Sequence, residues 1–306
     1  MKKVLLIYGG NSSEHEVSCK SAEAIIDNID KNKYDLDSVL ITRNNEWISN
    51  DIKIDNIIEY IKQFDVVFPI IHGTNGEDGK LQGMLDLFNI KYVGSKCGPS
   101  YLCIDKDRTK QVLYYNSIPQ VPYQVYNKKE DITIPYPIIV KPATGGSSIG
   151  ISIANNKKEL KKALKIAQKY DKKIILEHFL DNPQELECAV LEDKKLIISD
   201  VGEVIHNNTF YDFESKYNCK EINTTLSANI DESVKKRIQE YAKKAFEVLE
   251  LNGLARIDFF YHNGNIYLNE INTLPGFTKT SMYPSLIMKE NISYKDLITK
   301  LIENSL

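Results

Sequence analysis

Residues 4–16 read Val-Leu-Leu-Ile-Tyr-Gly-Gly-Asn-Ser-Ser-Glu-His-Glu, an apolar run followed by two glycines and a polar segment. The unbroken apolar run Val4–Tyr8 is typical of a strand buried on both faces of a sheet. Ser13 is followed three residues later by Glu16, which is the spacing of a capping box, so we expect a helix with Ser13 as its N-cap. This order of strand, glycines and helix is typical of a parallel α/β sheet.

The same alternation continues through residues 1–94. Further strands are predicted at Ser38–Thr42 and Asp65–Ile71, and the second ends directly before His72-Gly73. We therefore predict an N-terminal domain with a doubly wound parallel sheet. Ligands of such sheets bind beyond the carboxyl ends of the strands. Because Gly9-Gly10 and His72-Gly73 both follow predicted strands, we expect a binding site at this end of the sheet.

The rest of the chain has the pattern of two smaller α+β domains, over residues 95–181 and 182–306. The predicted fold class is thus mixed α/β and α+β, in three domains. Helices are expected near Asp105–Tyr115 and around residues 234–248, and strands at Ile138–Lys141, Ile151–Ala154, Lys173–His178, Glu185–Leu191 and Lys195–Val201.

Composition excludes several classes of protein. The 306 residues are 42% hydrophobic and 26% charged with a net charge of −3, which is ordinary for a globular chain and lacks the basic excess of a nucleic-acid-binding protein. No run approaches the ~18 apolar residues of a membrane-spanning helix, and the apolar run after Lys2-Lys3 is too short for a signal peptide. The five cysteines form no CxxC pair, as expected of reduced thiols. We expect a cytoplasmic protein that binds neither nucleic acid nor membrane.

Residues 255–261 and 265–271 flank His262-Asn263-Gly264 and predict a β-hairpin. A two-residue loop would place Asp258 and Glu270 on opposite faces of the hairpin. A three-residue loop would place Arg256, Asp258, Glu270 and Asn272 on one face. We predict the three-residue loop, because Gly264 suits the left-handed position that this loop requires.

Two carboxylates and an amide oxygen on one face form a hard oxygen site. Mg²⁺ binds such a site when phosphate groups complete its coordination. A solvent-facing charged surface with an Arg256–Glu270 cross-strand pair accounts for the same spacing equally well.

Residues 138–150, Ile-Ile-Val-Lys-Pro-Ala-Thr-Gly-Gly-Ser-Ser-Ile-Gly, form a strand that enters a loop of small residues. Backbone N–H groups and two hydroxyls of such a loop can surround phosphate oxygens, and Lys141 adds a positive charge. A flexible surface loop is the alternative. Lys106 is a candidate for a second phosphate contact, although a solvated surface lysine is the default interpretation.

Together these segments resemble the ATP-grasp enzymes and, within them, the D-alanine–D-alanine ligase family. The resemblance covers essentially the whole chain, and its segments occur in the family's order: Gly9–Ser18, His72–Gly79, Lys141–Gly150, Phe210–Tyr217, Ala255–Asp258 and Asn269–Thr278.

The resemblance implies an activity. ATP phosphorylates the carboxylate of one D-alanine, the amine of a second D-alanine attacks the acyl phosphate, and the dipeptide, ADP and phosphate leave. The resemblance also implies ATP held between the two C-terminal units, two Mg²⁺ ions with Mn²⁺ as a substitute, a homodimer, and a role in supplying peptidoglycan synthesis.

The resemblance assigns residues to ATP and metal. Lys106, Lys141 and Ser148 match phosphate contacts, and Lys216 matches a γ-phosphate contact. Glu177 matches the acceptor of the adenine amino group, and Glu185 matches the ribose contact. The remaining matches are the backbone of Phe179 and Leu180 beside adenine and the metal ligands Asp258, Glu270 and Asn272.

The resemblance also assigns the substrate site. Arg256 and the Gly276 N–H match donors to the tetrahedral oxyanion, and Ser281 matches a contact to the carboxylate of the second substrate. Glu14 matches the acceptor of the first substrate's ammonium group and is expected to form a hydrogen-bonded set with Ser147 and Tyr217. Tyr217 favours D-alanine as the second substrate. His72 either lines this site or is a packed histidine at a strand end.

Three other functions remain open on the sequence alone. Another ATP-grasp ligase would use the same glycine loop and hairpin, and only the segments around Glu14 and Tyr217 discriminate against it. A non-catalytic ATP-binding regulator is disfavoured by the intact residues Arg256, Asp258 and Glu270. A nicotinamide-dependent dehydrogenase is disfavoured because the segment at Gly9-Gly10 lacks a third glycine at the required spacing.

Overall fold

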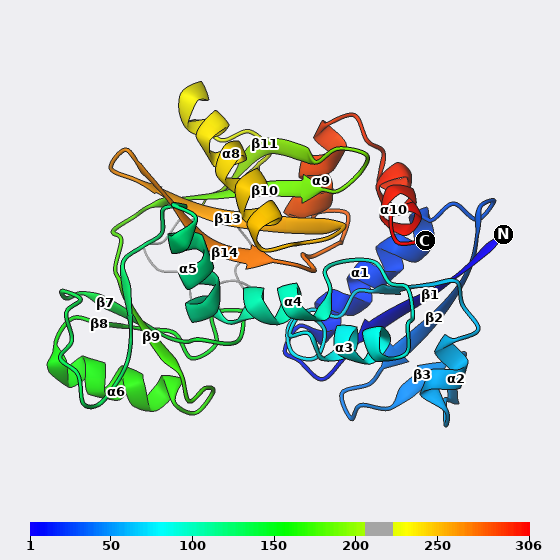
Figure 1. The fold of residues 1–306 in the computed structure, drawn as a ribbon, viewed down its shortest axis with the longest axis horizontal. Coiled ribbons are helices and arrows are strands. Elements are labelled where there is room, and N and C mark those ends of the chain that lie inside the picture. Colours follow the sequence, from blue (N-terminus) through cyan, green and yellow to red (C-terminus); the bar gives the residue numbers. More distant parts are fainter. Residues whose placement is uncertain (206–222) are drawn as a thin grey trace.

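The computed structural model describes residues 1–205 and 223–306, which form three sheets (Figure 1). The N-terminal sheet has the order β4-β3-β2-β1-β5, in which β1 is parallel to both β2 and β5. The predicted parallel sheet is therefore confirmed, with a short antiparallel extension at β3 and β4. Its strands are β1 (Lys2–Gly9), β2 (Tyr34–Ile41), β3 (Trp47–Ser49), β4 (Ile52–Lys53) and β5 (Val66–Pro69).

Strand β1 is buried on both faces, as its apolar run predicts. Val4 and Leu6 pack with helix α1 (His15–Asn28), whereas Leu5 and Ile7 pack with the opposite layer of α2 (Ile57–Ile61) and α3 (Lys80–Leu87). This alternation follows from the two-residue period of a strand. The strand ends at Gly9, directly before the turn that leads into α1.

The predicted cap of α1 is wrong. The N-cap is Glu14 rather than Ser13, and no side chain caps the helix. The hydroxyl of Ser12 instead accepts from the Glu14 N–H at 3.2 Å and donates to the carbonyl of His72 at 2.8 Å. The polar segment after β1 is thus fastened to the end of β5 rather than folded into a capping box.

The central sheet is small and has its own core. Its order is β6-β9-β7-β8, and α6 (Lys157–Ala167) packs against it through Leu160, Ala163, Leu164 and Ala167. Among the described residues, this hydrophobic cluster draws only on residues 126–176. The strands are β6 (Tyr123–Val125), β7 (Ile138–Pro142), β8 (Ser152–Ala154) and β9 (Ile174–His178).

The C-terminal sheet is antiparallel, in the order β12-β11-β10-β13-β14. Helix α8 (Glu232–Val248) covers one face of this sheet. Helices α9 (Met282–Lys289) and α10 (Tyr294–Glu303) lie on the other face and share a hydrophobic cluster with α1. The N-terminal and C-terminal units therefore share a continuous core. The strands are β10 (Gln184–Leu191), β11 (Ile197–Ile205), β12 (Asn223–Thr225), β13 (Leu254–His262) and β14 (Asn265–Asn272).

Two helices connect the N-terminal unit to the central sheet. Helix α4 (Cys97–Ile104) leads into α5 (Lys106–Tyr115), and Cys103 and Leu113 pack into the cluster below α8 of the C-terminal sheet. Helix α5 thus packs against the C-terminal core, although the chain that follows it enters the central sheet (Figure 1). In the part of the chain that the structure describes, no helix has the length and apolar character to cross a bilayer.

We expect Gly76→Ala to destabilise the protein strongly. A Cβ at Gly76 would lie 1.9 Å from the carbonyl oxygen of Ile71, so the backbone must shift. We expect a loss of about 2 kcal/mol or more in the free energy of unfolding, measured by urea denaturation. The matched control is Gly98→Ala in α4, where a Cβ meets nothing within 4 Å and should be neutral or slightly stabilising. Equal stability of the two variants would contradict this close approach.

Candidate active site

Two adjoining cavities meet at the centre of the molecule. One, of about 350 Å³, lies between the N-terminal unit and the C-terminal sheet. The other, of about 170 Å³, lies between the central and C-terminal sheets. Because they share wall residues, each opens beside the other. The shared residues are Gly146, Ser147, Glu185, Phe260, Asn269 and Glu270.

The hairpin of β13 and β14 forms part of both walls, and its loop differs from the prediction. The loop has two residues, since His262 pairs with Asn265 and both Asn263 and Gly264 adopt positive φ. The predicted three-residue loop is therefore wrong. A register shift between Asp258 and Phe259 nevertheless places Asp258 directly opposite Glu270, because one extra residue of β14 is accommodated there as a β-bulge. The two carboxylates therefore share a face for a reason that loop length does not supply.

Arg256 neutralises part of this acidic face. Its Nε and a terminal nitrogen each donate to Asp258 at 2.8 Å, and Nε lies 3.2 Å from Glu187. Burial alone would lower the pKa of Arg256, but the carboxylates of Asp258 and Glu187 outweigh burial and raise it. Glu187 pairs with Asp258 across β10 and β13, so three acidic residues stand in a row across three strands. Sequence analysis missed Glu187, although its two-residue spacing from Glu185 places it on the same face of β10.

The donor set of this face fits a hard divalent cation bound together with phosphate groups. Asp258 and Glu270 supply carboxylates, and Asn272 lies close enough for its Nδ2 to donate to Asp258 at 2.9 Å. A half-turn of that amide would present its oxygen to a cation instead. No three His, Cys, Asp or Glu side chains among the described residues form a metal-binding group. A cation here would therefore depend on oxygens from a ligand, as Mg²⁺ commonly does.

The glycine loop between β7 and β8 faces the smaller cavity. Ser147 and Ser148 of this loop both line the cavity and have positive φ. A Cβ at Gly146 would meet nothing within 4 Å, and its backbone is not left-handed, so neither packing nor conformation requires glycine there. Close approach of a ligand to the backbone is a remaining reason for glycine.

Lys106, the first residue of α5, bridges the glycine loop and the hairpin. Its Nζ donates to the carbonyl of Gly145 at 2.6 Å and lies 3.6 Å from the Glu270 carboxylate. The lysine therefore stands where both walls of the smaller cavity meet, rather than in bulk solvent.

A buried ion cluster lies deeper in the same cavity. Glu177 accepts from Lys141 through one carboxylate oxygen, and its other oxygen lies 2.7 Å from Nζ of Lys110. Burial alone would raise the pKa of Glu177, but the two ammonium groups lower it to about 2. Phe179, Leu180 and Glu185 line the same cavity. The structure thus brings together the residues that sequence analysis connected with a nucleotide.

The larger cavity is lined by Glu14, His72, Arg256 and Gly276, four of the five residues expected to contact substrate; Ser281 is not part of its wall. Ser147 Oγ donates to the Glu14 carboxylate at 2.6 Å, which joins the glycine loop to the N-terminal unit. His72 lines this cavity, and both its ring nitrogens also have protein partners, since Nδ1 lies 2.9 Å from the Leu274 carbonyl and Nε2 lies 3.1 Å from Ser21 Oγ. Burial lowers the pKa of His72, which favours a neutral ring.

Two further expected residues lie at the end of the hairpin. Gly276 lines the larger cavity, and a Cβ there would come within 3.0 Å of Ser281 Oγ. The hydroxyl of Ser281 accepts from the Thr278 N–H at 3.0 Å. Lys216 and Tyr217, by contrast, lie outside the described residues.

Comparisons with known proteins identify the family. The family model for the D-ala D-ala ligase C-terminus matches residues 113–303. The model for the D-ala D-ala ligase N-terminus matches residues 3–59 and 49–95. The chain belongs to the D-alanine–D-alanine ligase family.

Individual relatives match over nearly their full length. A D-alanine–D-alanine ligase of Ruminiclostridium cellulolyticum is 40% identical over 99% of this chain and 94% of its own. Among solved structures, the VanG D-Ala:D-Ser ligase of Enterococcus faecalis has a TM-score of 0.91 and 34% identity, covering 100% of this chain and 99% of its own. The Bacillus anthracis D-alanine–D-alanine ligase complexed with ATP has a TM-score of 0.81 and 28% identity, covering 100% and 97%. The three-unit architecture is thus that of the D-alanine–D-alanine ligases.

Sequence analysis of this family member missed Lys110 and Glu77. Lys110 is four residues after Lys106, a spacing that places both on one face of a helix and could have drawn attention to it. Glu77 accepts from the N–H groups of Gly73 and Leu274 and lines the larger cavity. Burial and the nearby Glu14 raise the pKa of Glu77 to about 8.

We expect Lys110→Met to reduce stability and to change its dependence on pH. Because the pKa of Glu177 is lower in the folded state than its ordinary 4.5, its ionisation stabilises the protein above pH 4.5. That stabilisation disappears as pH falls towards about 2. Removing one ammonium group should raise the folded-state pKa of Glu177 and cost about 3 kcal/mol near pH 7.

Urea unfolding between pH 2 and 7 measures both effects. The variant should lose less stability than the wild type over the acidic part of this range. Lys165→Met, an exposed lysine of α6, is the control and should follow the wild type. Parallel curves for Lys110→Met and the wild type would contradict the role of Lys110 in ionising Glu177.

Proposed function

We propose that this protein is an ATP-dependent ligase that joins two D-alanines into D-alanyl-D-alanine, releases ADP and phosphate, and supplies peptidoglycan synthesis. The observation that carries the proposal is the meeting of two cavities at one acidic face. The cavity beside Lys106 and Lys141 and the larger cavity share Glu270 and the glycine-loop residues Gly146 and Ser147. A carboxylate in one cavity can therefore reach the terminal phosphate of a nucleotide in the other.

ATP is proposed to lie between the central and C-terminal sheets. Lys106, Lys141 and Ser148, which all line this cavity, would hold its phosphates. The ionised carboxylate of Glu177 can accept only, so it suits an amino group such as that of adenine. The backbone beside Phe179 and Leu180 would complete the adenine contacts, and Glu185 would accept from the ribose.

We further propose that Asp258, Glu270 and Asn272 hold two Mg²⁺ ions, for which Mn²⁺ can substitute. Bound there, the cations would neutralise charge on the phosphates during phosphoryl transfer. Lys106 already lies 3.6 Å from Glu270. The lysine and the cations would therefore act on the same phosphate oxygens.

The substrate contacts follow from the larger cavity. Glu14 would accept from the ammonium group of the first D-alanine, and His72 would shape the pocket as a neutral ring. Arg256 and the Gly276 N–H would donate to the oxyanion that forms when the second amine attacks. Ser281 would bind the carboxylate of the second D-alanine. The roles expected of Lys216 and Tyr217 fall outside the described residues and stay predictions.

The organisation of the protein completes the proposal. We place the three domains at residues 1–94, 95–181 and 182–306, with the qualification that α5 of the second stands on the core of the third. Cytoplasmic localisation and a homodimer rest on resemblance to the family.

An assay of ADP release tests the function. Purified protein with Mg²⁺-ATP should release ADP with D-alanine, not with L-alanine, and mass spectrometry should identify the dipeptide. D-serine is the specific alternative for the second substrate, because the VanG D-Ala:D-Ser ligase is so similar in fold. A mixed product from equal D-alanine and D-serine would favour that alternative. Absence of ADP release with every amino acid would contradict ligase activity.

We expect Arg256→Lys to lower kcat about 100-fold while the KM for ATP changes little. Lysine keeps the positive charge but loses the planar fork that donates twice to Asp258. Arg237→Lys, at an exposed position of α8, is the control and should leave both constants unchanged. An equal change of KM and kcat would place Arg256 in nucleotide binding instead.

A further inference from the structure

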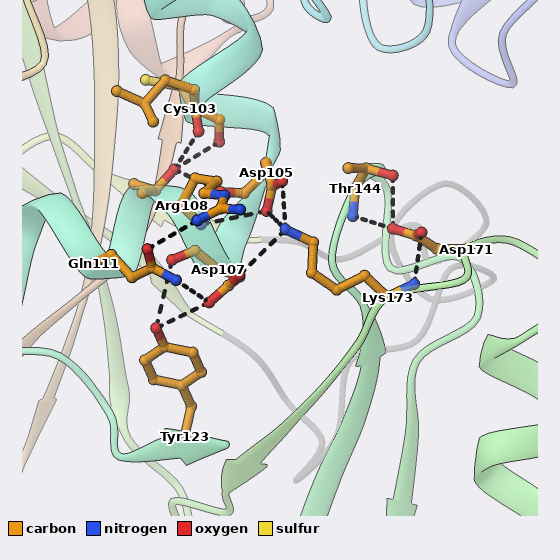
Figure 2. Close-up of polar contacts among 11 residues, drawn as sticks. Cys103, Asp105, Asp107, Arg108, Gln111, Tyr123, Thr144, Asp171 and Lys173 are labelled. Atoms are coloured by element: carbon orange, nitrogen blue, oxygen red, sulfur yellow. Dashed lines mark hydrogen bonds and ion pairs between the residues drawn. The ribbon is translucent and has the colours of Figure 1, made fainter. Parts of the chain in front are cut away.

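A second ion cluster, outside both cavities, joins α5 to the central sheet (Figure 2). Nζ of Lys173 donates to both carboxylate oxygens of Asp105, at 2.8 and 2.6 Å, and to Asp107 at 3.2 Å. The two aspartates are 2% and 5% exposed. The ammonium group of Lys173 therefore lies against the two buried carboxylates that flank Lys106 in the sequence.

The cluster connects two separate cores. Lys173 directly precedes β9 of the central sheet, whereas Asp105 is the N-cap of α5, which packs on the C-terminal core. The hydrophobic cluster of the central sheet includes no described residue of that core. The ion pairs therefore cross a boundary that apolar packing does not hold together.

Backbone contacts close a ring around Lys106. The Lys106 N–H donates to the Ala143 carbonyl at 2.9 Å, and the Ala143 N–H donates to the Lys173 carbonyl at 2.9 Å. The side chain of Lys173 then returns to the two neighbours of Lys106. The start of α5, the entry of the glycine loop and the start of β9 are thus fixed to one another.

The adjoining turn fastens the glycine loop to the same point. Thr144 donates through its N–H and its hydroxyl to one oxygen of Asp171, both at 2.7 Å, and the Lys173 N–H donates to the other oxygen at 2.9 Å (Figure 2). Burial alone would raise the pKa of Asp171, but these hydrogen bonds lower it. Lys173 is therefore held by its backbone as well as by its ammonium group.

Lys106 itself is directed away from this cluster, toward the Gly145 carbonyl and Glu270. Without a cation at Lys173, the two flanking aspartates would compete with Glu270 for the ammonium group of Lys106, the residue between them. Asp107 has other partners, Gln111 at 2.9 Å and Tyr123 at 3.2 Å, but both are neutral. Neutral donors do not cancel its charge.

We propose that Lys173 is a positioning residue for the phosphates of ATP: its ammonium group is the cation shared by Asp105 and Asp107, so that Lys106 stays directed into the glycine loop. The proposal rests on the function proposed above, in which Lys106 contacts phosphate. Lys173 contacts neither cavity wall and acts only through the ring that it closes.

Binding of ATP and of adenosine, measured by calorimetry without D-alanine, tests this proposal. Lys173→Met should weaken ATP binding at least tenfold and adenosine binding less than twofold, because only the phosphates depend on Lys106. Lys173→Arg should restore ATP binding to within about threefold of the wild type. Lys300→Met, which removes a similarly exposed lysine that pairs with Asp193 in the C-terminal unit, is the control and should change neither.

A charge-balanced variant guards against misfolding. Combining Lys173→Met with Asp105→Asn and Asp107→Asn removes the cation and both anions, and asparagine retains the capping ability of residue 105. This triple variant should recover most of the ATP affinity that Lys173→Met loses. Equal weakening of ATP and adenosine, unchanged ATP affinity in Lys173→Met, or no recovery in the triple variant would overturn the proposal. A wild-type protein that binds ATP but forms no dipeptide would overturn the proposed function alone.

Discussion

Repulsion among carboxylates on one face of the C-terminal sheet is the constraint around which the molecule is arranged. Glu187, Asp258 and Glu270 face one another across three strands. Like charges so close are stable only with cations beside them. Arg256 comes from the same sheet, whereas Lys106 comes from a different layer of the molecule. Cations from two separate parts of the molecule therefore meet at the acidic face of β13 and β14. A phosphate-bearing ligand and its metal ions could be accommodated at the same face.

The units differ in how they are held. The N-terminal and C-terminal units share an apolar core that includes Phe68, Phe277 and Tyr283, so they behave as one body. The central sheet keeps its own core and meets that body largely through polar groups, such as Lys173 with Asp105 and Ser147 with Glu14. Apolar burial resists separation strongly, whereas polar groups that separate regain hydrogen bonds from water, so breaking such contacts has a smaller net cost. The smaller cavity, in which we propose that ATP binds, lies along this weaker boundary.

Local patterns in the sequence predicted the elements well, and contacts between distant residues account for the errors. The apolar run Val4–Tyr8 became a strand because burial follows directly from composition. The capping box failed because Ser12 binds His72, sixty residues away. The hairpin loop was wrong, yet the shared face of Asp258 and Glu270 was right, since the bulge that restores the register has no local signature. Lys110 was missed because its ion pair with Glu177 forms only in the folded protein and has no local signature in the sequence.

The hydrogen bond from Ser147 to Glu14 joins the walls of two cavities that would hold different ligands. Under the proposed function, an amino acid bound at Glu14 would alter the partner of Ser147, and a nucleotide bound by the glycine loop would alter the partner of Glu14. Thermodynamic linkage then requires reciprocity: the factor by which one ligand changes the affinity of the other is the same in both directions. A single hydroxyl would thus couple the affinities of the two cavities, even though both cavities exist before either ligand binds.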